Sequence, residues 1–430
     1  MKYYSTNNRD YRVSLREAVV MGLAPDKGLF MPERFPVLTR QELESLRGMG
    51  FAETALLLSE RLFGEDIPEQ ALKDIVEGAL QFDIPVKEIK ENIYCVELFH
   101  GPTLAFKDVG ARFMARMLGW FTRQADGVVD VLVATSGDTG SAVANGFHGV
   151  EGVRVHVLYP SGKVSSLQEK QFTTLGGNIT ALEVDGTFDD CQRLVKEAFT
   201  DPGLRSKLTL TSANSINLAR FIPQSFYYFE AWKAFAGKQV VFSVPSGNFG
   251  NLTAGLLARE MGLPVDRFLA ATNINDIVPA YLASGVYSPR PSVSTVANAM
   301  DVGDPSNFIR IRELFGDRHE RMIRHISGYS YTDDEIRKAV GRVFRETGYV
   351  LDPHGATGFL SAERYLEDHP GDTLLFLETA HPAKFPDIVE AETVTTIEIP
   401  DRLAAFAGKQ KVSVKIGTNY QEFRSYLDKL

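Results

Sequence analysis

The sequence predicts an α/β protein with two parallel-sheet lobes and a mainly helical N-terminal unit. From about Asn92 onward, short apolar runs rich in β-branched residues alternate with stretches of helical spacing. This alternation favours parallel strands with helices on both faces of the sheet. The predicted strands are 128–133, 153–158, 179–184, 239–244, 268–271 and 373–377. They fall into two clusters divided near residues 221–238, which predicts two lobes with a cleft between them.

Polar capping residues set the expected helices. Beyond residue 80, one helix is predicted over 165–175. A second is predicted to begin after Thr187, with Asp190 as its capping acid, and a third after Thr332, with Glu335 in the same role. Residues 1–80 form the N-terminal unit, where Thr39 and Glu42 predict a capping box that opens a helix through Phe63.

A second helix of this unit is expected to begin near Pro68. Residues 81–90 have the composition of a linker. Residues 284–307 lack any period and are rich in Pro, Ser, Gly and Asn, so a long functional loop is expected there.

Composition excludes several classes of protein. The 430 residues are 44% hydrophobic and 23% charged, the balance of a water-soluble protein with two or three domains. A net charge of −9 disfavours nucleic acid and anionic membranes as partners. No run of about 20 apolar residues and no secretory signal is visible, so we expect a cytoplasmic protein. Cys95 and Cys191 lie far apart with no Cys/His cluster, which predicts neither a disulfide scaffold nor a metal site.

Residues 97–108 contain a candidate nucleophile. Lys107 lies at the end of an apolar segment in which Gly101 and Pro102 predict a turn. Partial desolvation lowers the pKa of such a lysine and frees its amine for attack on a carbonyl carbon. The alternative is a surface lysine at the start of a helix over 109–120. The segment alone leaves the two interpretations even.

Residues 131–141 predict a strand, a glycine loop and a helix. Loop amides at a helix N-terminus bind anions, and the hydroxyls of Ser136 and Thr139 add donors. The alternative is an ordinary turn in which Asp138 or Thr139 caps the helix.

Residues 241–255 repeat this arrangement in a form suited to a phosphate. Gly247, Asn248, Gly250 and Asn251 allow close approach of the backbone. The segment lacks the Lys-Ser/Thr of a Walker loop and the GxGxxG of a dinucleotide fold. A phosphate monoester that needs no magnesium is therefore expected, and the phosphate of pyridoxal 5′-phosphate (PLP) fits.

Two further segments carry polar candidates. Asn214, Asn217 and Arg220 are spaced three apart on one predicted helix face, and arginine is well shaped for phosphate. The alternative is a solvated helix face. Thr379 and His381 follow an apolar strand, where α/β folds place site residues. Thr379 either meets a ligand or ends the strand, and His381 is either a general base or structural.

Together and in this order, the five segments resemble threonine synthase. The resemblance extends over most of the chain, including residues 18–32 and 298–307, and is to the longer bacterial and fungal form. It implies a PLP-dependent enzyme of the tryptophan-synthase-β type, fold type II. It also implies an N-terminal domain over 1–80 and a catalytic core over 81–430 with PLP in the cleft. The expected smaller lobe is about 108–225, and the larger lobe comes from 81–107 and 226–430.

The resemblance also implies roles for individual residues. Lys107 matches the Schiff-base lysine, and Thr379 the residue bonded to the pyridine nitrogen. The loop around the cofactor phosphate is Gly247, Asn248, Phe249, Gly250 and Asn251. The expected substrate contacts are Ser136, Asp138, Thr139, Asn214, Arg220 and Lys163. The chain departs from the family pattern at Lys27, usually a second glycine, and at Asn7-Asn8, usually Arg-Gly.

The implied reaction converts O-phospho-L-homoserine and water to L-threonine and phosphate, the last step of threonine biosynthesis. The substrate amine displaces Lys107 to give an external aldimine, and the freed lysine is the general base. The alternatives are another PLP-dependent β/γ-eliminating enzyme, such as a serine or threonine dehydratase or an O-phosphoserine-using synthase, and a non-catalytic PLP-binding homologue. The sequence leaves open whether the chain is a monomer or a homodimer.

Overall fold

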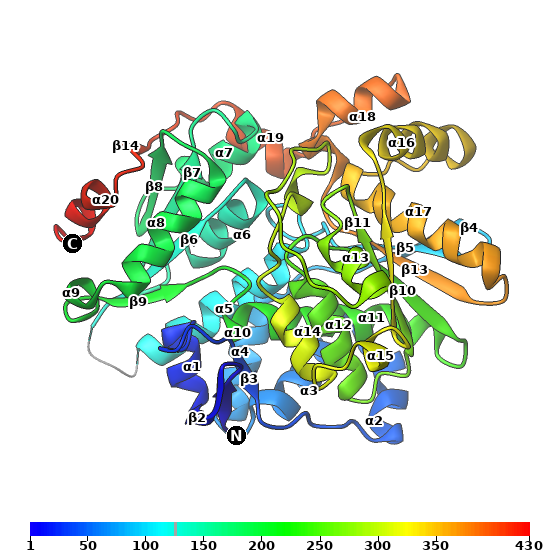
Figure 1. Cartoon of the computed structure of the whole chain (residues 1–430), viewed down its shortest axis with the longest axis horizontal. Helices are drawn as coiled ribbons and strands as arrows, with labels where there is room; N and C mark the ends of the chain where they lie inside the picture. The colour runs from blue at the N-terminus through cyan, green and yellow to red at the C-terminus, as the bar shows by residue number, and fades with distance from the viewer. Residues whose placement is uncertain (124–126) are drawn as a thin grey trace.

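Each lobe is built on its own sheet, as the computed structural model of residues 1–123 and 127–430 shows (Figure 1). The α/β class and its parallel sheets are as predicted. The six-stranded sheet of the larger lobe has the order β12 (Ile326–Ser330), β11 (Arg267–Thr272), β10 (Val240–Pro245), β13 (Thr373–Glu378), β5 (Ile93–Glu97) and β4 (Val86–Lys90). Only β4 at its edge is antiparallel to its neighbour.

The smaller lobe contains a five-stranded, wholly parallel sheet. Its order is β14 (Val414–Ile416), β8 (Ile179–Val184), β7 (Val153–Pro160), β6 (Val129–Ala134) and β9 (Thr209–Ser212). Its helices are α6 (Asp138–Phe147), α7 (Ser166–Thr173), α8 (Phe188–Thr200), α9 (Pro202–Arg205), α19 (Asp401–Ala407) and α20 (Tyr420–Leu427).

The last strand and helix of the chain lie in the smaller lobe, whereas the sequence placed residues 226–430 in the larger one. β14 pairs with β8, and α20 follows it. Ile416, Phe423 and Leu427 are buried in the same apolar cluster as Leu182 of β8 and Leu194 of α8. Burial of these side chains is the physical reason that the chain returns to the smaller lobe.

Among the helices of the larger lobe, the sequence predicted the one that follows the glycine loop of residues 241–255 and the one that follows Thr332. The helices of this lobe are α12 (Gly250–Glu260), α13 (Ile277–Ser284), α14 (Phe308–Leu314), α15 (His319–Met322), α16 (Asp333–Thr347), α17 (Pro353–Asp368) and α18 (Pro386–Thr393). The capping boxes predicted at Thr187 and at Thr332 are confirmed, because Asp190 and Glu335 complete them at the starts of α8 and α16.

The N-terminal unit contains α1 (Leu15–Met21), α2 (Arg40–Ser45), α3 (Phe51–Phe63) and α4 (Glu69–Ala79). It also contains a sheet that the sequence did not predict, formed by β1 (Tyr3–Ser5), β2 (Asn8–Val13) and β3 (Phe30–Pro32). The helix predicted from Thr39 through Phe63 is wrong as one element. It breaks between α2 and α3 because Gly48 and Gly50 disfavour a continuous helix.

The linker predicted over 81–90 is also wrong in its second half. β4 occupies Val86–Lys90 and pairs with β5. Lys87 and Glu88 are exposed, and Pro85 lies just before the strand, both features of an edge strand. The polar composition that indicated a linker therefore belongs to a sheet edge.

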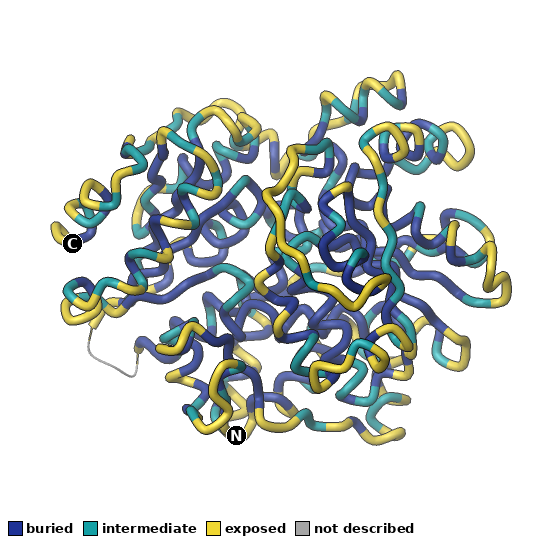
Figure 2. Tube along the Cα trace, in the orientation of Figure 1, coloured by how far each residue is buried: buried dark blue, intermediate teal, exposed yellow. Residues whose placement is uncertain are grey.

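A buried helix, α5 (Lys107–Thr122), joins the lobes. Its apolar residues Val109, Phe113, Met114 and Met117 are fully buried. The short helices α10 (Leu218–Phe221) and α11 (Phe226–Trp232) complete this central layer. The sheets and central helices are the buried parts of the chain in Figure 2, with exposed loops around them. No helix among the residues described here is long and apolar enough to cross a membrane.

Gly355 provides a test of how closely α17 packs against the end of β13 in the larger lobe. A Cβ added at this residue of α17 would lie 1.6 Å from Glu378 Oε2 at the end of β13. We expect Gly355→Ala to cost about 1–3 kcal/mol of stability through overpacking, measured as a fall in Tm. Gly371→Ala is the control, since a Cβ there meets no atom within 4 Å. Equal Tm values for the two variants would contradict the packing described.

Candidate active site

The loops after three strands meet at one cavity of about 1990 Å³. Ser136 follows β6, Gly247 follows β10 and Thr379 follows β13, and all three line the cavity. These loops lie at the carboxyl ends of parallel strands, the usual position of ligand sites in such folds. The long loop predicted over 284–307 also contributes to the wall, with Arg290 and Asp301 among its lining residues.

Lys107 lies at this wall as the first residue of α5. Among the described residues, Nζ lies 5.8 Å from the ring centroid of Phe106 and has no hydrogen bond or ion pair. Burial lowers the pKa of Lys107 to about 8. The Asp138 carboxylate opposes this shift, while Arg220 and Lys384 add to it. The amine is therefore available as a nucleophile at mildly alkaline pH, and of the two interpretations that the segment left open the geometry favours the buried nucleophile over a surface lysine.

Backbone contacts hold Lys107 close to Thr379. The Phe106 amide donates to the Thr379 carbonyl oxygen at 2.9 Å, and the His381 amide donates to Leu104 O at 3.0 Å. Ala105 and Ala380 form an antiparallel bridge between these bonds. Within the described chain the Thr379 hydroxyl has no hydrogen-bond partner, so it is free to face a ligand in the cavity.

The predicted phosphate loop carries unpaired amides. Within residues 1–123 and 127–430, the N–H groups of Gly247 through Gly250 donate no hydrogen bond. They lie at the N-terminus of α12, a position that favours an anion. Phe249 has a left-handed backbone with φ 59°, a strained conformation for an aromatic residue that is typical of functional sites.

The shape of this loop depends on two further contacts. Asn251 accepts from the Ser246 hydroxyl at 2.8 Å and donates to Pro245 O at 2.7 Å, so its side chain closes the loop. A Cβ at Gly247 would lie 2.7 Å from both Ala299 O and the Met300 Cα. Glycine is therefore required where residues 299–300 lie against the loop.

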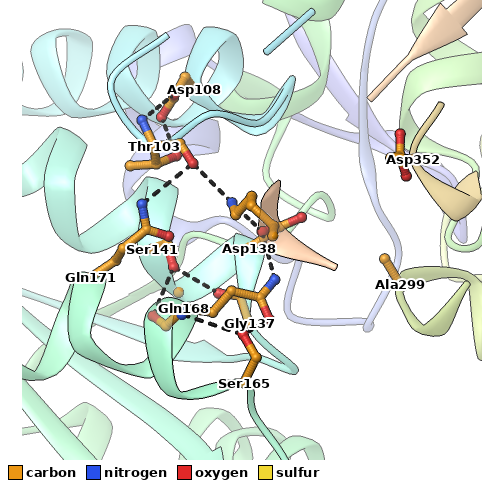
Figure 3. Close-up of polar contacts among 12 residues, drawn as sticks. Thr103, Asp108, Gly137, Asp138, Ser141, Ser165, Gln168, Gln171, Ala299 and Asp352 are labelled. Atoms are coloured by element: carbon orange, nitrogen blue, oxygen red, sulfur yellow. Dashed lines mark hydrogen bonds and ion pairs between the residues drawn. The ribbon is translucent and has the colours of Figure 1, made fainter. Parts of the chain in front are cut away.

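Ser136 and Thr139 line the cavity, but Asp138 between them does not. Its buried carboxylate pairs with Lys384. It also accepts from Gln168 Nε2 at 2.9 Å (Figure 3). Although burial raises the pKa of Asp138, Lys384 and Lys107 lower it to about 2. Ser136 and Thr139 of the predicted loop thus line the cavity, whereas the side chain of Asp138 points into a separate polar cluster.

The other predicted substrate contacts also reach the cavity. Asn214 donates to Ala134 O at 3.0 Å, while Lys163 is exposed at the rim. Arg220 is buried and donates to Ala213 O, yet its Nε has no partner. It forms no ion pair within the described chain, so its positive charge remains available for an anion.

His381 is placed as a structural residue. It accepts from the Ala383 amide at 3.1 Å and caps the 3-10 helix Pro382–Lys384. Burial lowers its pKa to about 4. It does not line the cavity. Of the two interpretations that the sequence left open, the geometry favours the structural one.

Sequence reasoning missed two polar residues near the cavity. Lys384 pairs with Asp138, and no periodicity singled it out. His354 lines the cavity, with Nδ1 2.6 Å from Asp352 Oδ1, and accepts from the Ala299 amide at 3.2 Å. The Asp-Pro-His sequence at the start of α17 was the available signal.

PLP needs three contacts from a protein: an amine that attacks its aldehyde, amides that bind its phosphate and a hydroxyl that meets its ring nitrogen. This cavity offers all three. The fold and site thus define a PLP-dependent enzyme of fold type II.

Comparisons with known proteins narrow the class. The family described as "Pyridoxal-phosphate dependent enzyme" matches residues 80–379, "Threonine synthase N terminus" matches 2–80, and "Threonine synthase, C-terminal" matches 355–426. The chain belongs to the threonine synthase family.

Full-length relatives support this membership. Threonine synthase from Serratia marcescens is 45% identical, with 99% of each chain covered. The crystal structure of threonine synthase from Escherichia coli has a TM-score of 0.92 at 44% identity, with both chains covered completely. A PLP-bound threonine synthase from Brucella melitensis has a TM-score of 0.93 at 34% identity, covering 99% of this chain and 98% of that one.

Replacement of Lys107 tests the anchoring amine. We expect Lys107→Ala to abolish the visible absorption of covalently bound cofactor, because no other amine occupies its place. Lys238→Ala, at an exposed lysine far along the chain, is expected to keep that absorption. An unchanged spectrum in the Lys107 variant would contradict the assignment.

The lowered pKa of Lys107 predicts a pH dependence for cofactor attachment. Only the neutral amine attacks an aldehyde, so the rate for cofactor-free protein should rise with pH and level off above about pH 8. With Nα-acetyl-lysine as control the rise should continue toward about pH 10, the ordinary lysine pKa. Stopped-flow absorbance measures both, and identical profiles would refute the shift.

Proposed function

We propose that this chain converts O-phospho-L-homoserine and water to L-threonine and inorganic phosphate. The observation that carries the proposal is that Lys107 and Arg220 line the same cavity. An unpaired amine beside a buried guanidinium suits a substrate with an α-amino group at one end and a phosphate at the other. The family membership of the whole chain supports the same reaction.

Lys107 has two tasks in this proposal. Its Nζ anchors the cofactor through the aldehyde carbon, and after the substrate amine takes that position it receives the proton from the substrate Cα. When bound, PLP supplies an electron sink for the negative charge left at Cα. A second proton then leaves Cβ and phosphate leaves Cγ. One proton returns to Cγ, the oxygen of water adds at Cβ, and a proton returns to Cα, so that the products are threonine and phosphate.

The cofactor would be held by its two ends. Gly247, Asn248, Phe249 and Gly250 would donate amide hydrogen bonds to its phosphate, with Asn251 keeping their loop closed. Thr379 would place its hydroxyl at the ring nitrogen. A hydroxyl supports a positive charge on that nitrogen less firmly than a carboxylate does.

The substrate would be held at both of its charged ends. Ser136 and Thr139 would donate to its carboxylate from the loop after β6, with Asp138 supporting that loop. Arg220, Asn214 and Lys163 would meet its phosphate. Ordering of these groups from both lobes excludes bulk water from the reacting carbons, so closure of the lobes is expected during turnover.

Arg220 also favours this reaction over the alternatives. A serine or threonine dehydratase acts on a substrate without phosphate and does not need a buried cation at the far end of the cavity. An O-phosphoserine-using synthase would need that cation one carbon closer to the amine. A non-catalytic homologue that only binds PLP would not need the substrate-facing hydroxyls of Ser136 and Thr139.

The sequence-based expectations on organisation stay part of the proposal. They are an N-terminal domain over 1–80, a catalytic core over 81–430 and a cytoplasmic location. Small molecules are the expected partners, in a monomer or a homodimer.

A phosphate-release assay tests the reaction. The purified protein loaded with PLP should release phosphate and L-threonine in equal amounts from O-phospho-L-homoserine. Loss of one charge-assisted contact in Arg220→Met should lower kcat/KM about 10- to 100-fold. Arg205→Met, at an exposed position on the outer rim of the same cavity, should change it little. Absence of phosphate release would overturn the proposed function.

A further inference from the structure

A buried ion pair joins the two lobes beside the proposed site. The Lys384 side chain is fully buried, and its Nζ pairs with Asp138 Oδ1 and donates to Thr103 O at 2.8 Å. Lys384 ends the 3-10 helix that follows β13 of the larger lobe. Asp138 begins α6 after β6 of the smaller lobe. We call Lys384 and Asp138 the interlobe ion pair.

A polar cluster surrounds this pair, and Figure 3 shows Asp138, Gln168, Gln171, Thr103 and Asp108 lying close together. Gln168 of α7 donates to Asp138, and Gln171 of the same helix donates to Thr103 O at 3.4 Å. The amide and hydroxyl of Thr103 both donate to Asp108 at 2.7 Å. Since Asp108 follows Lys107 directly, the cluster connects the substrate loop to the residue beside the reacting amine.

Stability alone is a weak explanation for the interlobe ion pair. Removal of two charges from water carries a large desolvation cost, and a buried pair can often be replaced by neutral residues without loss of stability. The location of the pair is more informative. Asp138 lies between Ser136 and Thr139, which line the cavity, so the pair fixes this loop relative to the larger lobe.

The ion pair also determines whether the Asp138 carboxylate interacts mainly with Lys384 or with Lys107. The charged groups that act on Lys107 are Asp138 from α6, Arg220 from α10 and Lys384 from the 3-10 helix. Of these, only the carboxylate favours a protonated amine. A carboxylate already paired with Lys384 competes less for the proton that Lys107 must give up.

Further charged groups lie beyond this set. Lys384 also acts on Asp108 and, with His100, Glu97 and Arg402, on His381. Asp108 is engaged by Thr103, so it does not replace Asp138 as the partner of Lys384.

We propose that Lys384 is a positioning residue: it holds the loop of residues 136–139 against the larger lobe and occupies the Asp138 carboxylate, which leaves the Lys107 amine free to act as a base. This inference rests on the proposed function, because its consequences are measured as changes in the kcat and KM of that reaction. Lys384 itself does not touch the cavity.

Three variants of the PLP-loaded enzyme separate the two effects. They are Lys384→Met, Asp138→Asn and the double variant, with Lys233→Met as control for loss of an ion pair far from the cavity. For each, kcat and KM for O-phospho-L-homoserine are measured against pH, together with the visible absorption of bound cofactor.

We expect the acidic limb of the kcat profile to move up by about one pH unit in Lys384→Met, because the carboxylate now faces Lys107 unpaired. The same limb should move down in Asp138→Asn and return close to that of the unmodified enzyme in the double variant. KM should rise about tenfold in all three, since none keeps the loop fixed to the larger lobe. Lys233→Met should change neither quantity.

The double variant keeps the proposal testable even where a single variant does not fold, because it buries no unpaired charge. A wild-type KM in a folded, PLP-loaded double variant would overturn the positioning role. An acidic limb that stays at the position of the unmodified enzyme in Lys384→Met or in Asp138→Asn would overturn the role toward Lys107. Unmodified enzyme that released no phosphate would instead overturn the proposed function, so the two failures are distinguishable.

Discussion

The short antiparallel contact between residues 104–106 and 379–381 is the constraint on which the site depends. It is made of backbone groups, so it sets the position of Lys107 relative to Thr379 whatever the neighbouring side chains do. Lys107 begins the central helix and Thr379 ends the central strand of the larger lobe. One contact therefore fixes the geometry of the amine and the hydroxyl, and the other loops are arranged around them.

Unpaired positive charge distinguishes this cavity from the rest of an acidic protein. The chain has a net charge of −9, yet buried Arg220 reaches the cavity wall without a carboxylate partner in the described chain. Arg310 is a second buried arginine with only neutral partners, donating to Phe30 O, Ile216 O and the Asn307 side chain. Burial lowers the pKa of both arginines. A phosphate-bearing ligand in the cavity would offset the desolvation of Arg220, whereas Arg310 does not line the cavity and is held by carbonyl oxygens.

Sequence reasoning worked where local chemistry decides the structure, and failed where distant residues do. The apolar strand runs and the capping boxes predicted the two lobes. The order of the glycine loops along the chain indicated that Lys107, Gly247 and Thr379 belong to one site, and all three line the same cavity. The pairing of Asp138 with Lys384 was not predictable, because it joins residues 246 positions apart through burial rather than through a repeated pattern. Asp138 alone looked like a helix cap or a substrate contact. The sheet of the N-terminal unit was missed because β1 and β3 are too short to show an alternating pattern, and β2 is polar and largely exposed.

The return of β14 to the smaller lobe has a consequence for how the protein is made. β14 covers the edge of β8, but a ribosome synthesises it more than 200 residues after that strand, by the numbering of the two strands. During this interval the nascent smaller lobe carries an open strand edge, and such edges pair readily with other chains. The last strand of the larger lobe, β13, is made before β14, so all strands of the larger sheet are synthesised before the smaller sheet receives its edge strand. The smaller lobe, whose other four strands are made early, thus receives its edge strand last, and the interval before β14 is made is when the polypeptide most needs shielding from its copies.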